Sequence, residues 1–211
     1  MQRVGIFGGS FDPPHIGHRS LVEVALNQLE LDEVWVIPVG KPVHRTLTAH
    51  ISAQQRLRWV ESMFEDLSRV RVMDWEVQQD EEVPAIETMR YVVKQLNVVP
   101  CWLLGMDAWQ GLPSWVAYPE HRGLCNVAVF SRQGERMQKH TDWLEATELS
   151  QGLDVKAGHV YYVDSNLPDV SATQIRRDIL TGKNVSAVLD ARIADEIQTA
   201  YAFKGSNGVN E

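Results

Sequence analysis

Two histidines three residues apart follow a short apolar segment near the start of the chain, in the stretch VGIFGGSFDPPHIGH. If a helix begins here, His15 and His18 share one of its faces. Such a pair suits three kinds of chemistry: ligation of a metal ion, capping of the helix, or binding of an anion. Zinc ligation is disfavoured, because the H-E-x-x-H pattern and an obvious cluster of further cysteine or carboxylate ligands do not occur in the sequence.

Anion binding accounts for more of this stretch than capping does. A helix N-terminus offers free N–H groups and the positive end of the helix dipole, and Gly8 and Gly9 allow a ligand to approach the backbone closely. Capping or packing would explain one histidine, but it explains less well two that follow paired glycines. The phosphate-loop pattern G-x-x-x-x-G-K-[ST] and the dinucleotide pattern G-x-G-x-x-G do not occur. We therefore predict a phosphate site of another kind.

Alternating strand-like and helical segments would position this site. Continuous apolar runs typical of parallel strands lie at residues 3–7, 33–38, 70–75, 101–105, 125–131 and 159–163. Helical patterns lie at residues 16–29, 52–67, 86–96, 172–180 and 186–203. The alternation predicts an α/β fold, a Rossmann-like doubly wound parallel sheet in a single domain spanning 1–211, with a C-terminal helical subregion at about 171–203. Ligands of such sheets bind at the carboxyl ends of the strands, where the two histidines lie.

Composition narrows the classes of partner. The chain has 211 residues, 44% of them hydrophobic, and a net charge of −8. This acidic balance disfavours a nucleic-acid binder. No apolar run approaches the roughly 20 residues that span a bilayer, and no basic-then-apolar leader precedes the first strand, so we expect a cytoplasmic protein without a membrane partner. Cys101 and Cys125 lie in apolar runs and are expected to be buried thiols.

Four stretches in order carry a resemblance to a known family. GGSFDPPHIGH resembles the H-x-G-H signature of the nucleotidylyltransferase superfamily, in the wider form of the bacterial nicotinate-mononucleotide adenylyltransferases. KPVHR, LLGMDAWQGLPSW and SATQIRRD resemble that family's later elements. The resemblance implies adenylyl transfer from ATP to nicotinate mononucleotide, giving deamido-NAD and pyrophosphate in NAD biosynthesis. It also implies Mg²⁺ that is held mainly by the ATP phosphates and water.

The same resemblance assigns the site residues. The acceptor phosphate is already largely ionised near neutral pH, because its second pKa is about 6, so catalysis needs positioning and charge neutralisation rather than a general base. The implied catalytic residues are His15, His18, Arg45 and Arg176. The implied ATP-binding residues are Gly8, Gly9, Ser10, Phe11, His15, His18, Gly105, Asp107, Arg132, Ser171, Thr173 and Arg176. The implied acceptor-binding residues are Lys41, His44, Arg45, Ala85, Thr88 and Trp115, the last by stacking on the pyridine ring.

Plainer interpretations stand beside several of these roles. The basic run at residues 41–45 could be a solvated loop, and Asp107 could simply cap a helix. Ser171 and Gln174 fit a capping box, in which the serine caps the helix and the glutamine reaches back. Arg177, next to Arg176, is expected to point elsewhere.

The acceptor pocket departs from the family pattern. Ala85 stands where the family carries a hydroxyl, Val116 replaces the tyrosine after the tryptophan, and Val43 replaces a proline. These changes leave open an acceptor other than nicotinate mononucleotide, such as nicotinamide mononucleotide or another phosphorylated compound. The pantetheine-phosphate adenylyltransferases usually lack the Trp115 element, and cytidylyltransferases need a different base pocket. A non-catalytic nucleotide-binding module is the alternative from another class. The sequence fits either a monomer or a homo-oligomer.

Overall fold

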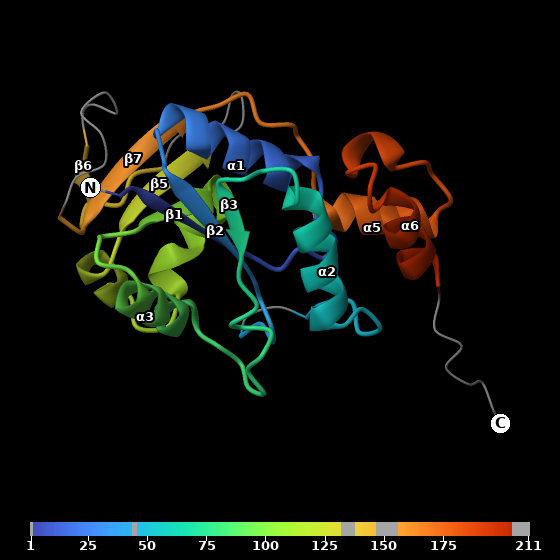
Figure 1. The fold of residues 1–211 in the computed structure, drawn as a ribbon, viewed down its shortest axis with the longest axis horizontal. Coiled ribbons are helices and arrows are strands. Elements are labelled where there is room, and N and C mark those ends of the chain that lie inside the picture. Colours follow the sequence, from blue (N-terminus) through green and yellow to red (C-terminus); the bar gives the residue numbers. More distant parts are fainter. Residues whose placement is uncertain (1, 44–45, 132–137, 147–155, 204–211) are drawn as a thin grey trace.

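The computed structural model describes residues 2–43, 46–131, 138–146 and 156–203, shown in Figure 1. The strands in this part of the chain form one parallel sheet in the order β3-β2-β1-β4-β5-β7-β6. Their bounds are β1 Val4–Gly9, β2 Glu33–Pro38, β3 Val70–Val72, β4 Cys101–Gly105, β5 Asn126–Ser131, β6 Leu144–Glu145 and β7 His159–Asp164. The α-helices are α1 Ile16–Gln28, α2 Ala53–Phe64, α3 Ala85–Gln95, α4 Met106–Gly111, α5 Ala172–Leu180 and α6 Ala194–Ala202.

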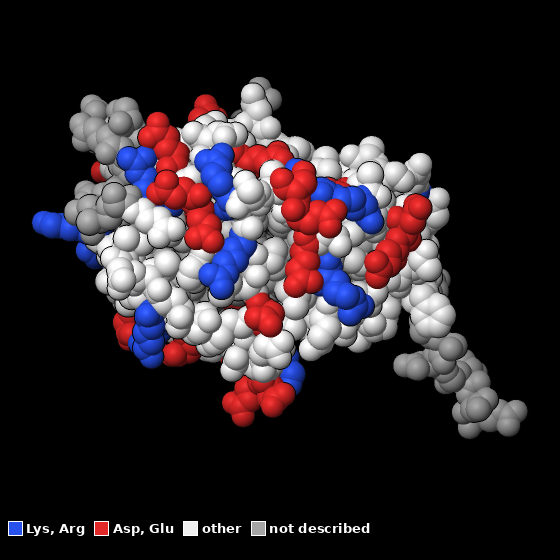
Figure 2. Space-filling model, in the orientation of Figure 1, with Lys and Arg blue, Asp and Glu red and all other residues white. Residues whose placement is uncertain are grey.

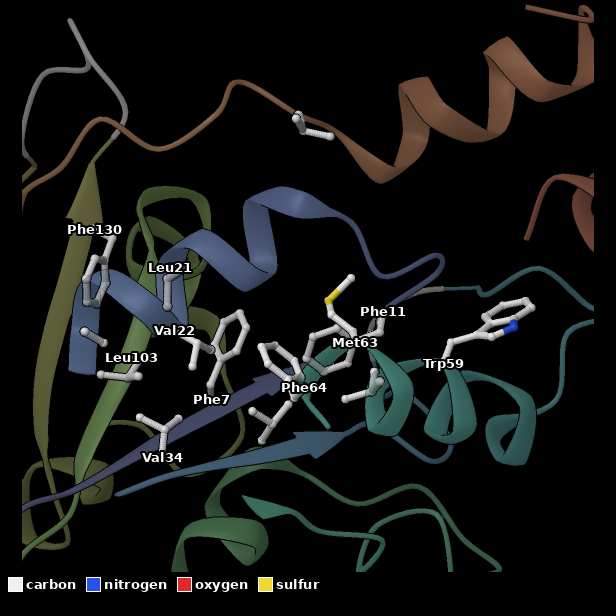
Figure 3. Packing of buried hydrophobic residues seen from close by; sticks show 14 of the residues in the cluster. Phe7, Phe11, Leu21, Val22, Val34, Trp59, Met63, Phe64, Leu103 and Phe130 are labelled. Carbon is white, nitrogen blue, oxygen red and sulfur yellow. The ribbon is translucent and has the colours of Figure 1, made fainter. Parts of the chain in front are cut away.

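Helices cover both faces of this sheet, which is why its central strands are mainly apolar on both faces. In β1, Val4 and Ile6 pack in a cluster with α3 and α4, whereas Phe7 packs in a second cluster with α1 and α2. Figure 3 shows this second cluster, with Leu21 of α1 and Phe64 of α2 over the sheet residues. The predicted Rossmann-like doubly wound fold is confirmed.

The strand order places a natural binding position beside β1. The chain runs outward from β1 through β2 to β3, then returns to the other side of β1 with β4. Crossover helices therefore diverge on either side of β1, and a crevice opens at the carboxyl ends of β1 and β4. Gly9 and Gly105 end these two strands.

Two predicted elements differ from the observed ones. The strand predicted at 70–75 ends at Val72, because the following residues turn, with the amide N–H of Gln78 donating to the Asp74 carbonyl. The helix predicted at 186–203 is a short 3₁₀ turn followed by α6. Between them the Asp190 carboxylate accepts a hydrogen bond from the Arg192 amide at 3.0 Å, a local bond that competes with helix formation.

The C-terminal helices share the core of the sheet. Ile175 and Ile179 of α5 and Ile197 and Tyr201 of α6 are buried in the same cluster as Phe7. Figure 1 shows α5 and α6 (orange to red) next to α2, at the end of the molecule away from β6. The helical subregion is therefore packed against the part of the molecule that carries the two histidines.

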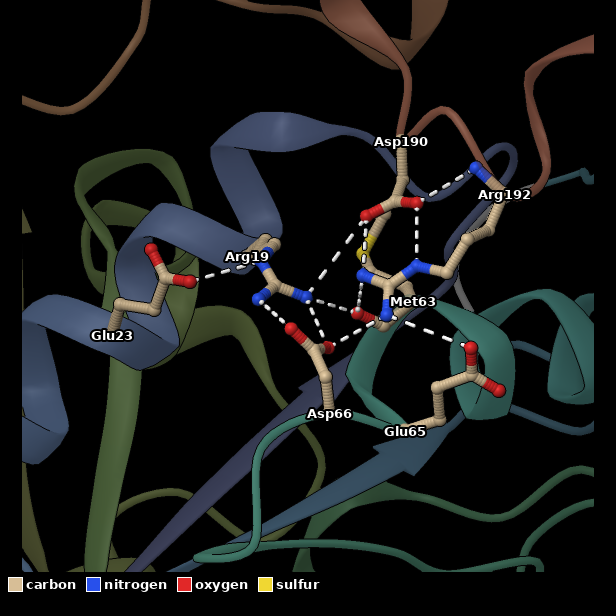
Figure 4. A network of polar contacts seen from close by, with 7 residues as sticks. All are labelled: Arg19, Glu23, Met63, Glu65, Asp66, Asp190 and Arg192. Atoms are coloured by element: carbon tan, nitrogen blue, oxygen red, sulfur yellow. Dashed lines mark hydrogen bonds and ion pairs between the residues drawn. The ribbon is translucent and has the colours of Figure 1, made fainter.

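A polar network on the surface ties the start of α1 to the C-terminal region (Figure 4). Arg19 and Arg192 each donate to the Asp66 carboxylate at 2.7 Å, and Arg192 also donates to Asp190 at 2.8 Å. Both arginines donate to the Met63 carbonyl at the end of α2. The two guanidinium groups hold the pKa of Asp66 well below its usual value. Because Arg19 directly follows His18, this network anchors the helix turn that carries the histidines.

The remaining expectations concern the thiols and the surface. Cys101 and Cys125 are free and buried, as expected, and burial raises the pKa of both thiols. On the face in Figure 2, basic and acidic side chains are interspersed. Among the described residues, no helix is long and apolar enough to cross a membrane.

Candidate active site

A cavity of about 740 Å³ opens at the carboxyl ends of β1 and β4. Its volume is in the range of small-molecule sites. Segments far apart in the sequence line it, including the β1–α1 loop, the starts of α3, α4 and α5, and Trp115 with Val116. The sequence-predicted residues in its lining are Gly8, Gly9, Ser10, His15, His18, Ala85, Thr88, Gly105, Asp107, Trp115, Ser171, Thr173 and Arg176.

His15 and His18 lie together at the start of α1, in this cavity. Their rings are stacked with centroids 3.8 Å apart. His15 is the N-cap residue, and its backbone N–H donates to Nδ1 of His18 at 3.1 Å. This bond uses only Nδ1 of His18. Capping and ligand binding are therefore compatible, because Nε2 remains for a ligand.

The position of the His15 ring explains why residue 17, between the two histidines, is a glycine. A Cβ atom at this position would lie 3.1 Å from both Cε1 and Nδ1 of the His15 ring, closer than ordinary van der Waals contact. The glycine lets the His15 ring lie over the first turn of α1, where the helix N–H groups are not yet used by intrahelical bonds.

The hydrogen bond to Nδ1 also fixes the tautomer of His18. In a neutral imidazole whose Nδ1 accepts, the proton lies on Nε2, which is then a donor. Burial, with a smaller effect from neighbouring His15, holds the pKa of His18 well below its usual value. His18 thus presents a neutral Nε2–H donor near neutral pH, and a bound anion would favour the charged form.

Arg176 reaches the β1–α1 loop from α5. Its guanidinium donates to the backbone carbonyl of Asp12 at 2.5 Å and lies 3.7 Å from the Asp12 carboxylate. That carboxylate is fixed in turn by the Tyr201 hydroxyl of α6 at 2.5 Å and by the Thr48 amide at 3.1 Å. Asp12 therefore orients the arginine beside the histidine pair.

The start of α5 differs from its prediction in one respect. Ser171 is the N-cap residue, but its side chain makes no capping hydrogen bond. The Gln174 amide donates instead to Asp178, one turn further along, at 2.9 Å. The prediction of a capping box at Ser171 is therefore wrong. Ser171 and Thr173 lie in the cavity lining, and Thr173 accepts a hydrogen bond from Arg176 at 3.3 Å.

Gly105 and Asp107 lie where β4 leads into α4. Gly105 is the N-cap residue of α4, so Asp107 is not the cap but an exposed residue of its first turn. Both line the cavity. A carboxylate in this position can accept hydrogen bonds from a sugar hydroxyl pair.

Another part of the lining combines an aromatic ring with the start of α3. Trp115 is partly exposed and packs edge-to-face on Trp102, with centroids 5.2 Å apart. Ala85 is the first residue of α3, whose N-cap residue Pro84 makes no side-chain capping bond. Thr88, on the same helix, donates to the buried Glu76 carboxyl at 2.6 Å.

Two predicted binding residues lie outside the lining. The Phe11 ring is fully buried and supports His18 at a centroid distance of 4.8 Å, with Phe11 itself in the left-handed region at φ 47°. The Lys41 ammonium donates to the Asp80 carbonyl. Three others, His44, Arg45 and Arg132, lie outside the described residues.

The sequence did not predict the residues that hold the loops of the site in place by hydrogen bonds. Asp12 was inside the signature stretch and could have been singled out as its charged residue. Arg56 of α2 is 1% exposed and donates to the carbonyls of Ser10 at 2.7 Å and Gly40 at 3.0 Å, so it joins the loops that follow β1 and β2. For Arg56, Glu76 and Tyr201 the sequence carries no local signal, because their partners are distant along the chain.

Comparison of the sequence with known proteins identifies the family of this chain. A family model described as cytidylyltransferase-like matches residues 6–178. A probable nicotinate-nucleotide adenylyltransferase of Shewanella pealeana is 31% identical over 97% of this chain and 97% of that protein. One of Pseudomonas aeruginosa, strain UCBPP-PA14, is 34% identical over 96% of this chain and 98% of that protein. The chain belongs to the nicotinate-nucleotide adenylyltransferase family.

The fold is similar to that of solved structures. A Plasmodium falciparum nicotinic acid mononucleotide adenylyltransferase complexed with NaAD superposes with a TM-score of 0.77 at 16% identity, covering 97% of this chain and 99% of that one. The same enzyme complexed with APC gives a TM-score of 0.68. The predicted family and the predicted class, a nucleotidyltransferase, are confirmed for this member of the nicotinate-nucleotide adenylyltransferases.

Proposed function

We propose that this chain transfers the adenylyl group of ATP to nicotinate mononucleotide, forming deamido-NAD and pyrophosphate. The observation that carries the proposal is that one cavity is lined by two chemically different sets of groups. His18 and Arg176 belong to the first set, and Trp115 with the start of α3 belongs to the second. The first set suits a polyphosphate and the second suits a flat ring with a polar substituent.

The reaction needs no proton acceptor in this site. An oxygen of the acceptor phosphate attacks the α-phosphorus of ATP and forms the new P–O bond. The bond from that phosphorus to the bridging oxygen breaks, and pyrophosphate leaves with the electron pair. The Nε2–H of His18 and the free N–H groups of α1 stabilise the charge that builds on the phosphoryl oxygens. Arg176 binds the outer phosphates, which depart as pyrophosphate.

We also propose that Mg²⁺ enters with ATP. In the described part of the chain, no group of three or more histidine, cysteine or carboxylate side chains could hold a metal ion. This fits an ion whose ligands are mainly phosphate oxygens and water. The ion would neutralise charge on the leaving pyrophosphate.

Release of pyrophosphate from ATP and Mg²⁺ tests the function directly. Nicotinate mononucleotide, nicotinamide mononucleotide and 4′-phosphopantetheine are compared as acceptors, and CTP is compared with ATP as donor. We expect turnover with ATP and a pyridine mononucleotide, with the highest kcat/KM for nicotinate mononucleotide. Preference for the pantetheine compound or for CTP would contradict the proposal, and turnover of none would indicate a binding module.

Trp115→Ala is expected to raise KM for both pyridine mononucleotides about tenfold, because stacking of aromatic rings contributes about 0.5–1.5 kcal/mol beyond buried area. The ratio of the two kcat/KM values should change little, since both rings stack alike. Trp115→Phe keeps an aromatic face and should stay within a few-fold of the wild type. An unchanged KM in the alanine variant would remove Trp115 from the acceptor site.

A further inference from the structure

A buried carboxyl group lines the cavity together with the proposed acceptor-binding residues. Glu76 is only 4% exposed, yet it lines the same cavity as Ala85, Thr88 and Trp115. Its Oε1 lies 2.6 Å from the Thr88 hydroxyl. We propose that the Glu76–Thr88 pair sets how the site discriminates a carboxylate from a carboxamide on the acceptor ring. This proposal rests on the proposed function, because it concerns the choice between acceptors of that reaction.

The ionised form of Glu76 favours the carboxamide. A carboxylate can only accept hydrogen bonds, so the Thr88 hydroxyl must donate to it. The Thr88 oxygen then offers only lone pairs to a ligand, and a carboxamide N–H can donate to them. A ligand carboxylate finds no donor in Thr88 and is repelled by the buried negative charge.

The neutral form of Glu76 favours the carboxylate. A protonated Glu76 donates to the Thr88 oxygen, and the hydroxyl hydrogen of Thr88 is released for the ligand. The negative charge that opposed a ligand carboxylate is gone. The free N–H groups at the start of α3, beside Ala85, add donors for the same carboxylate. The two proton arrangements of one pair thus select opposite acceptors.

The surroundings place the change between these forms near neutral pH. Burial raises the pKa of Glu76 to about 7, although the Thr88 hydroxyl, the Gly40 backbone and the Arg56 guanidinium each oppose the rise. Arg56 faces Glu76 from α2, and it is also near Asp12 and Tyr201. Among the described residues, two charged side chains next to these groups in the sequence have other partners: Lys41, after Gly40, with the Asp80 carbonyl, and Glu87, before Thr88, with Arg90.

Acceptor preference should therefore depend on pH in the wild-type enzyme. The quantity measured is the ratio of kcat/KM for nicotinate mononucleotide to kcat/KM for nicotinamide mononucleotide, with ATP and Mg²⁺, from about pH 6 to about pH 8.5. Titration of the acceptor phosphate and of ATP affects both acceptors alike and cancels in the ratio. We expect the ratio to fall about tenfold as pH rises through the pKa of Glu76. A constant ratio would overturn the proposal.

Glu76→Gln provides the corresponding variant. Its amide cannot ionise, so we expect the ratio at about pH 8 to be about tenfold above that of the wild type and to lose its pH dependence. Glu87→Gln is the matched control, because it removes the same charge one residue before Thr88 from an exposed position. This control should keep the wild-type ratio and pH profile.

Substitutions of Thr88 test the other half of the pair. Thr88→Ser keeps the hydroxyl and should keep the pH-dependent ratio, whereas Thr88→Val should weaken the dependence, because only the charge of Glu76 then remains to discriminate. If both acceptors are used with one ratio in every variant and at every pH, the pair does not discriminate, although the proposed function stands. If the wild type uses neither acceptor, the proposed function itself fails. Should Glu76→Gln lack a cooperative thermal transition, the wild-type profile decides.

Discussion

Replacement of His18 by alanine is expected to lower kcat about 10²–10³-fold, the usual cost of losing one preorganised donor to a developing charge. The structure defines the tautomer of this donor. Nδ1 accepts from the backbone of His15, so Nε2 carries the proton that the proposed mechanism directs to the phosphoryl group. ATP binding should change less than kcat, because the charge on the reacting oxygens is greatest in the transition state.

The control for this variant is His50→Ala. His50 is exposed, lies outside the cavity lining and contacts the Ala200 carbonyl at 3.1 Å. Because alanine at position 18 also removes a contact to the N-cap residue, thermal melting of both variants is measured alongside kcat. A His18→Ala enzyme that stays folded and keeps near wild-type kcat would exclude His18 from the chemistry.

Arg176→Ala is expected to raise KM for ATP about 10–100-fold while changing KM for the acceptor much less. A hydrogen bond to a charged group is worth about 1.5–3 kcal/mol, and Arg176 is already oriented by Asp12 before any ligand binds. Arg176→Lys keeps the charge but loses the planar fork that matches phosphate, so it should fall between the wild type and the alanine variant.

Arg177→Ala is the matched control, since it removes an adjacent arginine from the same helix. Arg177 is exposed, lies outside the lining and donates to Gln174 at 3.3 Å, as expected from the sequence. Its variant should bind ATP normally. Initial rates that show equal changes in both Michaelis constants for Arg176→Ala would contradict its assignment to ATP.

Local patterns in the sequence were sufficient to predict the sheet and most helices. The runs at 33–38 and 101–105 coincide with β2 and β4, because strands buried on both faces need continuous apolar residues. The segment at 172–180 coincides with α5. The helix at 186–203 could not be predicted correctly, because the break depends on which hydrogen bond the Asp190 carboxylate makes. β6 is two residues long, too short for any periodicity.

The residues of the candidate site also divide into those that local patterns predict and those that depend on contacts between distant segments. His15, His18 and Arg176 could be predicted because they lie in stretches that resemble a family, and the structure brings them to one cavity. Gln174 fits a capping box by spacing alone, but its amide bonds Asp178 instead. The pairing of Glu76 with Thr88 depends on a turn and a helix folding against each other, which no pattern in either segment reveals.

The Asp12–Tyr201 hydrogen bond has a consequence for the order in which this enzyme matures on the ribosome. Asp12 lies in the loop after the first strand, and its partner is 189 residues further along the chain. The sheet and the histidine pair can form during synthesis, since domains fold from their N-terminal parts as they emerge. The Asp12 carboxylate next to Arg176 gains its Tyr201 partner only after α6 has been made and has docked. The arginine should therefore be held in its final position only once Tyr201 has emerged from the ribosome.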